Sequence, residues 1–320
     1  MDLIRDESGP GWPELEYAAW RDTCQTLHMW TQIVGKVRLA CTPWINHSWH
    51  VSQYVTARGL TTSLIPHGAS AFQIDFDFID HLLQIRRDDG RQAVVRLYPR
   101  SVADFHAEFM ARLDELGLNV RIHGAPNEVI DPIPFRLDHV HASYDSAYAN
   151  RFWRVLVHSA CVLNDFRGDF LGKCSPVHFF WGSFDLAVTR FSGRRAPEHP
   201  GGVPNMPDWA AREAYSHEVS SAGFWSGSDS YPHATFYSYA YPSPAGLSGR
   251  TVAPTAAAWS TELSEFVLPY AAVQSASDPD AALMSFLQST YAAAADLANW
   301  DRPALEWADG ARPRPGSRAG

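Results

Sequence analysis

Lysine is almost absent from this sequence. Only Lys36 and Lys173 occur among its 26 basic residues, and 35 acidic residues give a formal net charge of −9. Nucleic-acid-binding proteins gain much of their affinity from lysines and arginines that neutralise phosphates. The charge balance therefore argues against a nucleic-acid partner. The other 24 basic residues are arginines. Where arginine is so strongly preferred, each lysine is a candidate for a role that needs a flexible, positively charged hydrogen-bond donor.

Long hydrophobic runs are also missing. No stretch approaches the roughly 20 apolar residues of a transmembrane helix, and the acidic start MDLIRDESGPGWPELEY lacks the apolar segment of a signal peptide. The four cysteines, Cys24, Cys41, Cys161 and Cys174, show no CxxC spacing. We therefore expect a cytoplasmic protein with reduced thiols and no membrane partner.

Several sequence signatures of catalysis are absent too. There is no glycine-rich phosphate loop of the P-loop or GxGxxG type, so nucleotide-dependent chemistry is not supported. The nucleophile motif GxSxG does not occur. The zinc motif HExxH fails at His217, because its second histidine position is Ser221. These absences exclude the common hydrolase signatures and leave the reaction open.

The sequence is instead rich in aromatic residues, which make up 13% of its 320 positions and include twelve tryptophans. Large aromatic side chains fill a hydrophobic core or line a pocket for a flat or apolar ligand. Both uses are compatible with a chain of this length, which is sufficient for one large domain.

Hydrophobic periodicity predicts both helices and strands. Helices are expected over residues 14–34, 101–116 and 146–166 and from Pro279 to about residue 294, and strands over residues 48–56, 71–78, 82–86, 93–98, 177–181, 184–191 and about 235–241. Ser101 and Asp278 are expected to cap two of the helices. Strand runs and helix runs are segregated, and the links between strands are short. The predicted class is α+β with a mainly antiparallel sheet and packed helices.

A proline-containing stretch divides the chain into two halves. Residues 124–144 include Pro126, Pro132 and Pro134, and they predict an ordered crossing rather than a flexible linker. We expect one compact domain over residues 10–305, with intimately associated halves at about 10–123 and 145–305. Residues 306–320 are rich in arginine, proline and glycine and predict a disordered tail.

Two segments gather the titratable residues that are the best candidates for a site. They are residues 172–194 (GKCSPVHFFWGSFDLAVTRFSGR) and 215–227 (YSHEVSSAGFWSG). Imidazoles and carboxylates buried in apolar surroundings must be hydrogen-bonded, paired or metal-bound. The candidate catalytic residues are His178, Asp185, His217 and Glu218. His217 and Glu218 can serve one site only in a loop or bend, since neighbours on a strand point apart.

His178 and Asp185 can belong to one site only if the chain bends between them. His178 and Asp185 are seven residues apart and share a face only if Gly182–Ser183 forms a bulge or tight turn. The candidate substrate-binding residues are Lys173, Trp181, Arg190, Tyr215 and Trp225, with Lys173 and Arg190 suited to an anionic group. His47, His50, His178 and His217 are the candidate ligands of a divalent transition metal. For His50, a buried and hydrogen-bonded structural role is the competing interpretation.

The leading functional hypothesis is an enzyme that acts on a small organic substrate, anionic or aromatic, through this His/Glu/Asp site, with or without a metal. The alternative is a non-catalytic protein that binds a small molecule in an aromatic-lined pocket. That pocket would draw its walls from the following residues: Trp181, Phe184, Phe224, Trp225, Phe236, Tyr237 and Tyr239.

The same segments resemble an uncharacterised bacterial family, a domain of unknown function similar over nearly the whole chain. The resemblance rests on GWPEL at residues 11–15, on residues 172–194, on AYSHEVSSAGFW at residues 214–225 and on FYSYAYP at residues 236–242. It implies no activity and assigns no catalytic residue. The family usually has proline after GFW, where this chain has Ser226.

Overall fold

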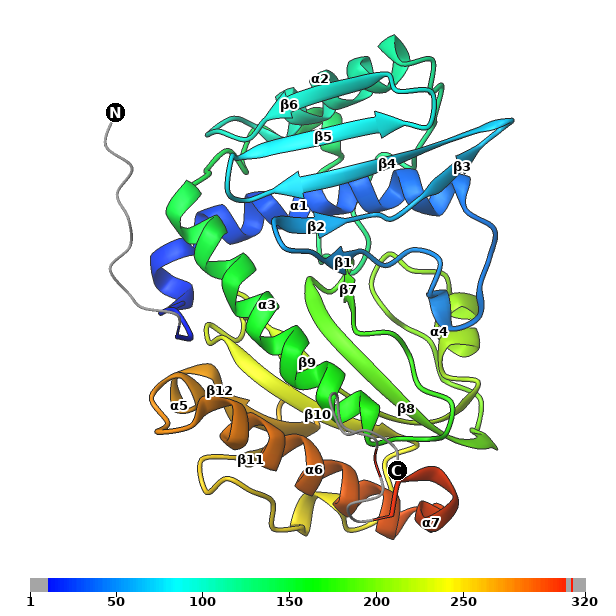
Figure 1. Cartoon of the computed structure of the whole chain (residues 1–320), viewed down its shortest axis with the longest axis vertical. Helices are drawn as coiled ribbons and strands as arrows, with labels where there is room; N and C mark the ends of the chain where they lie inside the picture. The colour runs from blue at the N-terminus through cyan, green and yellow to red at the C-terminus, as the bar shows by residue number, and fades with distance from the viewer. Residues whose placement is uncertain (1–10, 309–311, 313–320) are drawn as a thin grey trace, which may run out of the picture.

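Two antiparallel sheets with helices packed against them form the protein (Figure 1). The computed structural model describes residues 11–308 and Arg312. The first sheet has the order β1-β2-β4-β5-β6, with β3 also paired to β4. The second has the order β11-β12-β10-β9-β8-β7. The predicted α+β class with mainly antiparallel sheets is confirmed.

The strands of the first sheet are β1 (Tyr54–Val55), β2 (Gly59–Thr61), β3 (Ile65–His67), β4 (Ser70–Asp77), β5 (Leu82–Arg87) and β6 (Gln92–Arg96). Those of the second are β7 (His178–Phe180), β8 (Asp185–Arg195), β9 (His217–Trp225), β10 (Thr235–Tyr241), β11 (Ala258–Ser260) and β12 (Glu265–Pro269). The α-helices are α1 (Tyr17–Cys41), α2 (Val102–Glu115), α3 (Ser146–Gly168), α4 (Asp208–Ala214), α5 (Tyr270–Gln274), α6 (Pro279–Leu297) and α7 (Arg302–Leu305). Three 3₁₀ turns are η1 (Asn46–Ser48), η2 (Phe135–Leu137) and η3 (Leu247–Gly249).

Local signals place most of these elements as predicted. On β4, Phe72, Ile74 and Phe76 alternate into the core. Ser101 caps α2 by accepting a 3.1 Å hydrogen bond from the backbone N–H of Asp104. Asp278 caps α6 by accepting a 3.0 Å bond from the N–H of Ala281. Such caps satisfy backbone donors that a helix start leaves unpaired.

The strand predicted over residues 48–56 is wrong except for its last part. Residues 46–48 form η1, a turn continues to Val51, and only Tyr54–Val55 pairs with β2. His47 and Ser48 have φ angles of 59° and 57°, which no strand accommodates. The imidazole of His50 closes the turn, because its Nδ1 accepts a 3.2 Å bond from the N–H of Ile45. Side-chain bonds to the backbone have replaced strand pairing here.

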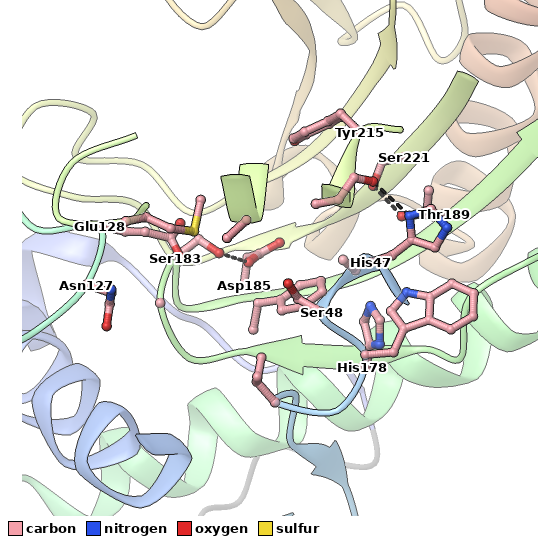
Figure 2. Close-up of a pocket in the computed structure, with 18 of the residues that line it drawn as sticks. His47, Ser48, Asn127, Glu128, His178, Ser183, Asp185, Thr189, Tyr215 and Ser221 are labelled. Carbon is pink, nitrogen blue, oxygen red and sulfur yellow. Dashed lines mark hydrogen bonds between the residues drawn. The ribbon is translucent and has the colours of Figure 1, made fainter. Parts of the chain in front are cut away.

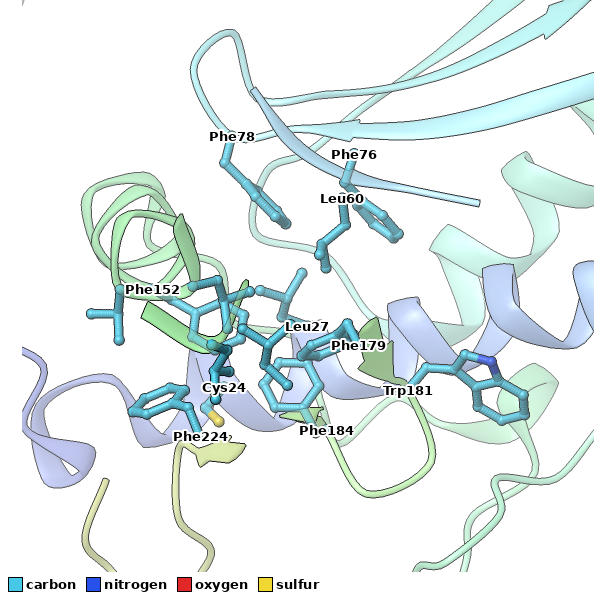
Figure 3. Packing of buried hydrophobic residues seen from close by; sticks show 14 of the residues in the cluster. Cys24, Leu27, Leu60, Phe76, Phe78, Phe152, Phe179, Trp181, Phe184 and Phe224 are labelled. Carbon is cyan, nitrogen blue, oxygen red and sulfur yellow. The ribbon is translucent and has the colours of Figure 1, made fainter. Parts of the chain in front are cut away.

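Hydrophobic packing joins the two halves of the chain. Gln53 and Phe179 exchange backbone hydrogen bonds of 2.8 and 2.7 Å, which connect the end of the first sheet to β7. Figure 3 shows Leu27 of α1 and Phe152 of α3 gathered with Phe179 and Phe184. Helices α3 and α6 pack on one face of the second sheet, as Figure 1 shows. The other face is therefore available for a site.

The predicted tail begins too early at residue 306. The carboxylate of Glu306 accepts a 2.7 Å bond from Arg302, and the N–H of Trp307 donates a 3.3 Å bond to the carbonyl of Asp169. The rest of the tail prediction, apart from Ala308 and Arg312, lies outside the described residues, as does the start of the chain through residue 10. None of the described helices is both long and apolar enough to span a bilayer.

Candidate functional site

A cavity of about 480 Å³ lies on the face of the second sheet opposite α3 and α6. Asp185, Ala187, Thr189 and Phe191 alternate along one face of β8 and line it, as do residues of β7, β9 and β10. Leu39 and residues 44–51, 127–128, 181–183 and 206–215 contribute the remaining walls. Pockets for small organic ligands have volumes of roughly 300–1,000 Å³, so this cavity is large enough for one.

Two exposed tryptophans line the cavity and contact each other. Trp44 precedes η1 and Trp209 lies in α4, and their ring centroids are 4.8 Å apart. They are 43% and 57% exposed, although both line the cavity. Large apolar side chains in such a position mark a site for binding. The wall of the cavity at these two segments is therefore apolar and reaches the molecular surface.

The carboxyl of Asp185 is buried in the cavity wall and hydrogen-bonded to two hydroxyls. It is 7% exposed and accepts hydrogen bonds from the hydroxyls of Ser183 and Tyr237. Burial raises the pKa of its carboxyl, and the two bonds oppose that effect. Figure 2 shows Ser183 and Asp185 joined by such a bond near Glu128. We call Glu128, Ser183 and Asp185 the acidic end of the cavity.

The turn that precedes Asp185 meets the condition under which His178 and Asp185 could share a face. Residues 181–184 form a tight turn between β7 and β8, and His178 and Asp185 both line the cavity. Phe180 pairs with Asp185 across the two strands, which places His178 two residues further along the same face. The turn at Gly182–Ser183 therefore brings the two candidates to one wall.

Glu128 is the second acid of the cavity, and the sequence analysis missed it. Its backbone has a φ of 60°, and its N–H donates a 2.8 Å bond to the carbonyl of Pro204. Burial, followed by the nearby charge of Asp185, raises the pKa of its carboxyl to about 7. A Cβ atom at Gly182 would lie 2.0 Å from Oε1 of Glu128. The carboxyl thus rests directly on the backbone of the turn before β8.

A polar stripe on α1 holds this end of the cavity in place. His28, Gln32 and Lys36 follow one another at four-residue spacing and so share a helix face. Gln32 exchanges two 2.8 Å bonds with the backbone of Asn127, and Lys36 donates to the Asn127 side chain. His28 Nε2 lies 2.8 Å from the carbonyl oxygen of Gly182. The stripe therefore positions both the Glu128 loop and the β7–β8 turn.

Tyrosines form the wall behind Asp185. Tyr237 and Tyr239 on β10 lie with ring centroids 6.1 Å apart, and the Tyr239 hydroxyl is 2.9 Å from that of Tyr215. Glu265 begins the neighbouring strand β12. Burial and the charge of Asp185 raise the pKa of its carboxyl to about 8. Glu265 is therefore, besides Glu128, another acid near Asp185 with a raised pKa, although it does not line the cavity.

His178 is a neutral part of the wall. The residue is fully buried, its Nδ1 lies 3.4 Å from the Ser52 hydroxyl, and its Nε2 has no partner among the described residues. Burial lowers the pKa of its imidazole to about 3. At neutral pH it offers one donor and one acceptor and no charge.

The opposite end of the cavity contains His47, Thr189 and Phe191, which we call the histidine end. His47 Nδ1 lies 2.9 Å from the carbonyl oxygen of Ala214 and therefore carries the proton. Its Nε2 then accepts a 2.6 Å bond from the ammonium of Lys173. Lys173 also lies 4.8 Å from the Phe191 ring centroid. This predicted substrate-binding lysine supports the wall and does not line the cavity.

The structure does not assemble the predicted pair of His217 and Glu218. Both lie on the regular strand β9, where neighbouring side chains point to opposite faces. Glu218 pairs with Arg194 at 2.7 Å on the far side of the sheet, beside α6. The His217 ring lies 5.9 Å from that of His47 but does not line the cavity. Neither His217 nor Glu218 lines the cavity together with Asp185.

Two of the predicted substrate-binding residues also lie elsewhere. Arg190 is 1% exposed on the opposite face of β8, with its guanidinium 3.4 Å from the Phe166 ring centroid. Burial lowers its pKa to about 10. Trp225 stacks on Tyr231 at the end of β9. Trp181 and Tyr215 do line the cavity, as do Tyr237 and Tyr239, whereas Phe184, Phe224 and Phe236 are buried in the core.

The four histidines proposed as metal ligands are not gathered. His50 is held at Ile45, His178 lies near Ser52, and only His47 and His217 are neighbours. Across the described residues, no three or more His, Cys, Asp or Glu side chains are arranged to hold a metal ion. The ammonium of Lys173 also occupies the nitrogen that His47 would use.

Some of the site residues that were not predicted have a recognisable sequence pattern, and others have none. His28, Gln32 and Lys36 recur at four-residue spacing on α1, a regular polar pattern that can be read from the sequence. Glu128 has no such sequence pattern. Its position depends on hydrogen bonds from its own N–H to Pro204 and from the neighbouring Asn127 side chain to Asn205, and both partners are distant in the sequence.

Comparison with curated proteins gives no match, and neither does comparison with solved structures. A family model described as "Family of unknown function (DUF5996)" matches residues 12–307. This span includes both sheets and every wall of the cavity. The chain belongs to this family of unknown function, DUF5996.

Proposed function

We propose that the protein is an enzyme that acts on a small organic molecule in this cavity through proton transfer by Glu128 and Asp185. One observation carries the proposal: two carboxyls of different environment line the same end of an aromatic-walled cavity. Asp185 receives two hydrogen bonds, whereas the carboxyl of Glu128 receives none from the described residues. Pairs of acids in unequal surroundings can serve as proton donor and acceptor at the same pH.

The pKa of about 7 suits Glu128 to this role. A general acid or base works best when its pKa is close to the pH at which it operates. Asp185 is a candidate for the partner that accepts or stabilises charge, with Tyr237 and Ser183 holding it in position. The four cysteines are free thiols, which suits the cytoplasmic location that we propose, where thiols stay reduced.

The experiment is to incubate the protein with a metabolite mixture and to follow each compound by mass spectrometry. Wild type should consume at least one compound. Glu128→Gln should slow that consumption about a hundredfold or more while a thermal-shift assay still shows binding. Glu262→Gln, which removes an exposed acid from the turn before β12, is the matched control and should behave as wild type.

A second candidate is a non-catalytic small-molecule-binding protein. The exposed Trp44 and Trp209 in the cavity wall support this candidate, because pockets that bind small molecules are lined mainly by hydrophobic and aromatic side chains. Compounds that stabilise the protein and are never consumed would favour it over the enzyme. In that case, Glu128→Gln should weaken binding by only about 1–3 kcal/mol.

A further inference from the structure

The charged side chains that line the cavity are all acids. Glu128 and Asp185 line it, and none of the described lining residues is a lysine or an arginine. The two histidines of the wall do not supply a positive charge, since burial lowers the pKa of both His47 and His178. A ligand in this cavity therefore meets negative charge and no positive charge.

The positive groups nearest to the acidic end are engaged elsewhere. The Lys36 ammonium donates to the Asn127 side chain and lies 5.6 Å from the centroid of the Trp181 ring. Burial lowers the pKa of this lysine to about 8. The His28 ring lies against Gly182, and burial lowers its pKa to about 4. Neither group pairs with Glu128 or Asp185.

Polar groups in the cavity wall lack partners. The carboxyl of Glu128 has no hydrogen bond or ion pair within the described part of the chain. Nε2 of His178 in the same wall is also unpartnered, but the residue is fully buried and this atom has no surface open to a ligand. The unpartnered carboxyl of Glu128 can therefore accept hydrogen bonds from a ligand that donates them.

The aromatic walls favour the same kind of ligand. Trp181 and Phe180 line the cavity beside the acidic end, and Trp49 and Phe191 line it at the histidine end. The faces of aromatic rings attract cations. The protein already uses two of these rings in this way, since Lys173 lies 5.4 Å from the Trp49 ring centroid and Lys36 lies above Trp181.

We propose that the cavity takes an organic cation, a primary or secondary ammonium on a flat apolar body. Its charge lies between Glu128 and Asp185, and its body lies against the aromatic walls. This inference rests on the proposed function, because it names the substrate class of the same cavity. Glu128 must be ionised to pair with the ammonium, so binding below about pH 7 releases a proton from this carboxyl.

Three probes of nearly equal shape and different charge test the inference. They are tryptamine, tryptophol and indole-3-propionate, which are cationic, neutral and anionic. Isothermal titration calorimetry on the full chain should show tryptamine binding about tenfold tighter than tryptophol, or more, and indole-3-propionate binding weakest. The affinity for tryptamine should fall as the pH drops from 8 to 6, because the pKa of Glu265 is raised to about 8 and that of Glu128 to about 7, so both carboxyls take up protons over this range. Burial raises the pKa of Asp185 as well.

Two variants test whether the preference for tryptamine arises from binding in this cavity. Glu128→Gln keeps the shape of the protonated acid and should lose the preference for tryptamine, whereas Glu262→Gln should keep it. Equal or tighter binding of tryptophol or indole-3-propionate overturns the inference, and so does the absence of tryptamine binding at millimolar concentration. Neither result decides the proposed function, which the consumption of metabolites tests separately.

Discussion

The hydroxyl of Tyr237 reaches Asp185 because the strand between them carries a glycine where the side chain crosses it. Tyr237 on β10 pairs with Gly223 on β9, and Gly223 pairs with Ala187 on β8. A Cβ atom at position 223 would lie 2.6 Å from the Tyr237 hydroxyl and 2.0 Å from the carbonyl oxygen of Leu186. This glycine belongs to the segment that resembles the family, and its role is to leave room for that contact.

Gly223→Ala should therefore destabilise the protein. The clash with Leu186 involves backbone, which has little freedom to move, and overpacking of this kind costs about 1–3 kcal/mol. Urea unfolding measures the effect. Gly249→Ala is the control, because a Cβ atom there meets nothing within 4 Å. If Gly223→Ala unfolds at the same urea concentration as wild type, the contact does not depend on the glycine.

Single residues were predictable only where the local pattern determined their environment. The spacing of His178 and Asp185 required a turn at Gly182–Ser183, and that turn is present. The pairing of His217 with Glu218 required a bend, and a straight strand is found instead. Glu128 was beyond sequence reasoning, because folding brings its loop against Gly182 from more than fifty positions away.

Helix α1 acts as the support for the acidic end. Through Gln32 it satisfies both the N–H and the carbonyl of Asn127, and through His28 it contacts Gly182. Gln32→Leu leaves those two backbone groups of Asn127 without partners, at a cost of about 1–3 kcal/mol. We expect faster amide hydrogen exchange at Asn127, measured by mass spectrometry or NMR.

Gln25→Leu provides the comparison on the same helix. Gln25 bonds to Asp229 and not to the loop, so its loss should leave exchange at Asn127 unchanged. Similar exchange in wild type and Gln32→Leu would show that α1 does not hold the loop.

Elements were predictable where capping residues and periodicity agreed. Helices α2 and α6 begin at their predicted caps, and β4 and β10 follow the predicted pattern. The segment around η1 alternates like a strand, but two hydrogen bonds close it into a turn. The Thr42 hydroxyl donates to the carbonyl of His50, and the N–H of Ile45 donates to the imidazole of His50. Such competition between side-chain bonds and strand pairing is not visible in the pattern of apolar residues.

At the scale of the whole molecule, hydrophobic packing connects both sheets and all the long helices. This continuity supports the proposal of one domain over residues 10–305, which limited proteolysis tests. Stable, separable fragments on either side of residues 124–144 would contradict it. The cavity draws walls from both halves, from residues 44–51 and from the second sheet, so separation of the halves would destroy it.

Global stability should depend on the ionisation of Glu128. Its pKa is about 7 in the folded protein against an ordinary 4.5, so the folded state holds the proton more tightly. The stability that this group contributes is full below about pH 4.5 and is lost as the pH rises through about 7. The loss for wild type is up to about 3 kcal/mol.

Glu128→Gln cannot ionise and should not show this loss. Relative to wild type, the variant should therefore be more stable at pH 8 than at pH 5, as measured by urea unfolding. Because Glu265 is unchanged in the variant, the difference isolates Glu128. Parallel pH profiles for the two proteins would mean that Glu128 has an ordinary pKa.

The most direct test of the account is a crystal structure of the protein with a compound that it consumes or tightly binds. The account predicts that the compound lies over β8 in the cavity, with a polar atom within about 3.2 Å of the Glu128 or Asp185 carboxyl and its apolar part against Trp181. A compound bound elsewhere, or one in the cavity that touches neither carboxyl, would contradict the central claim that these two acids form the functional site.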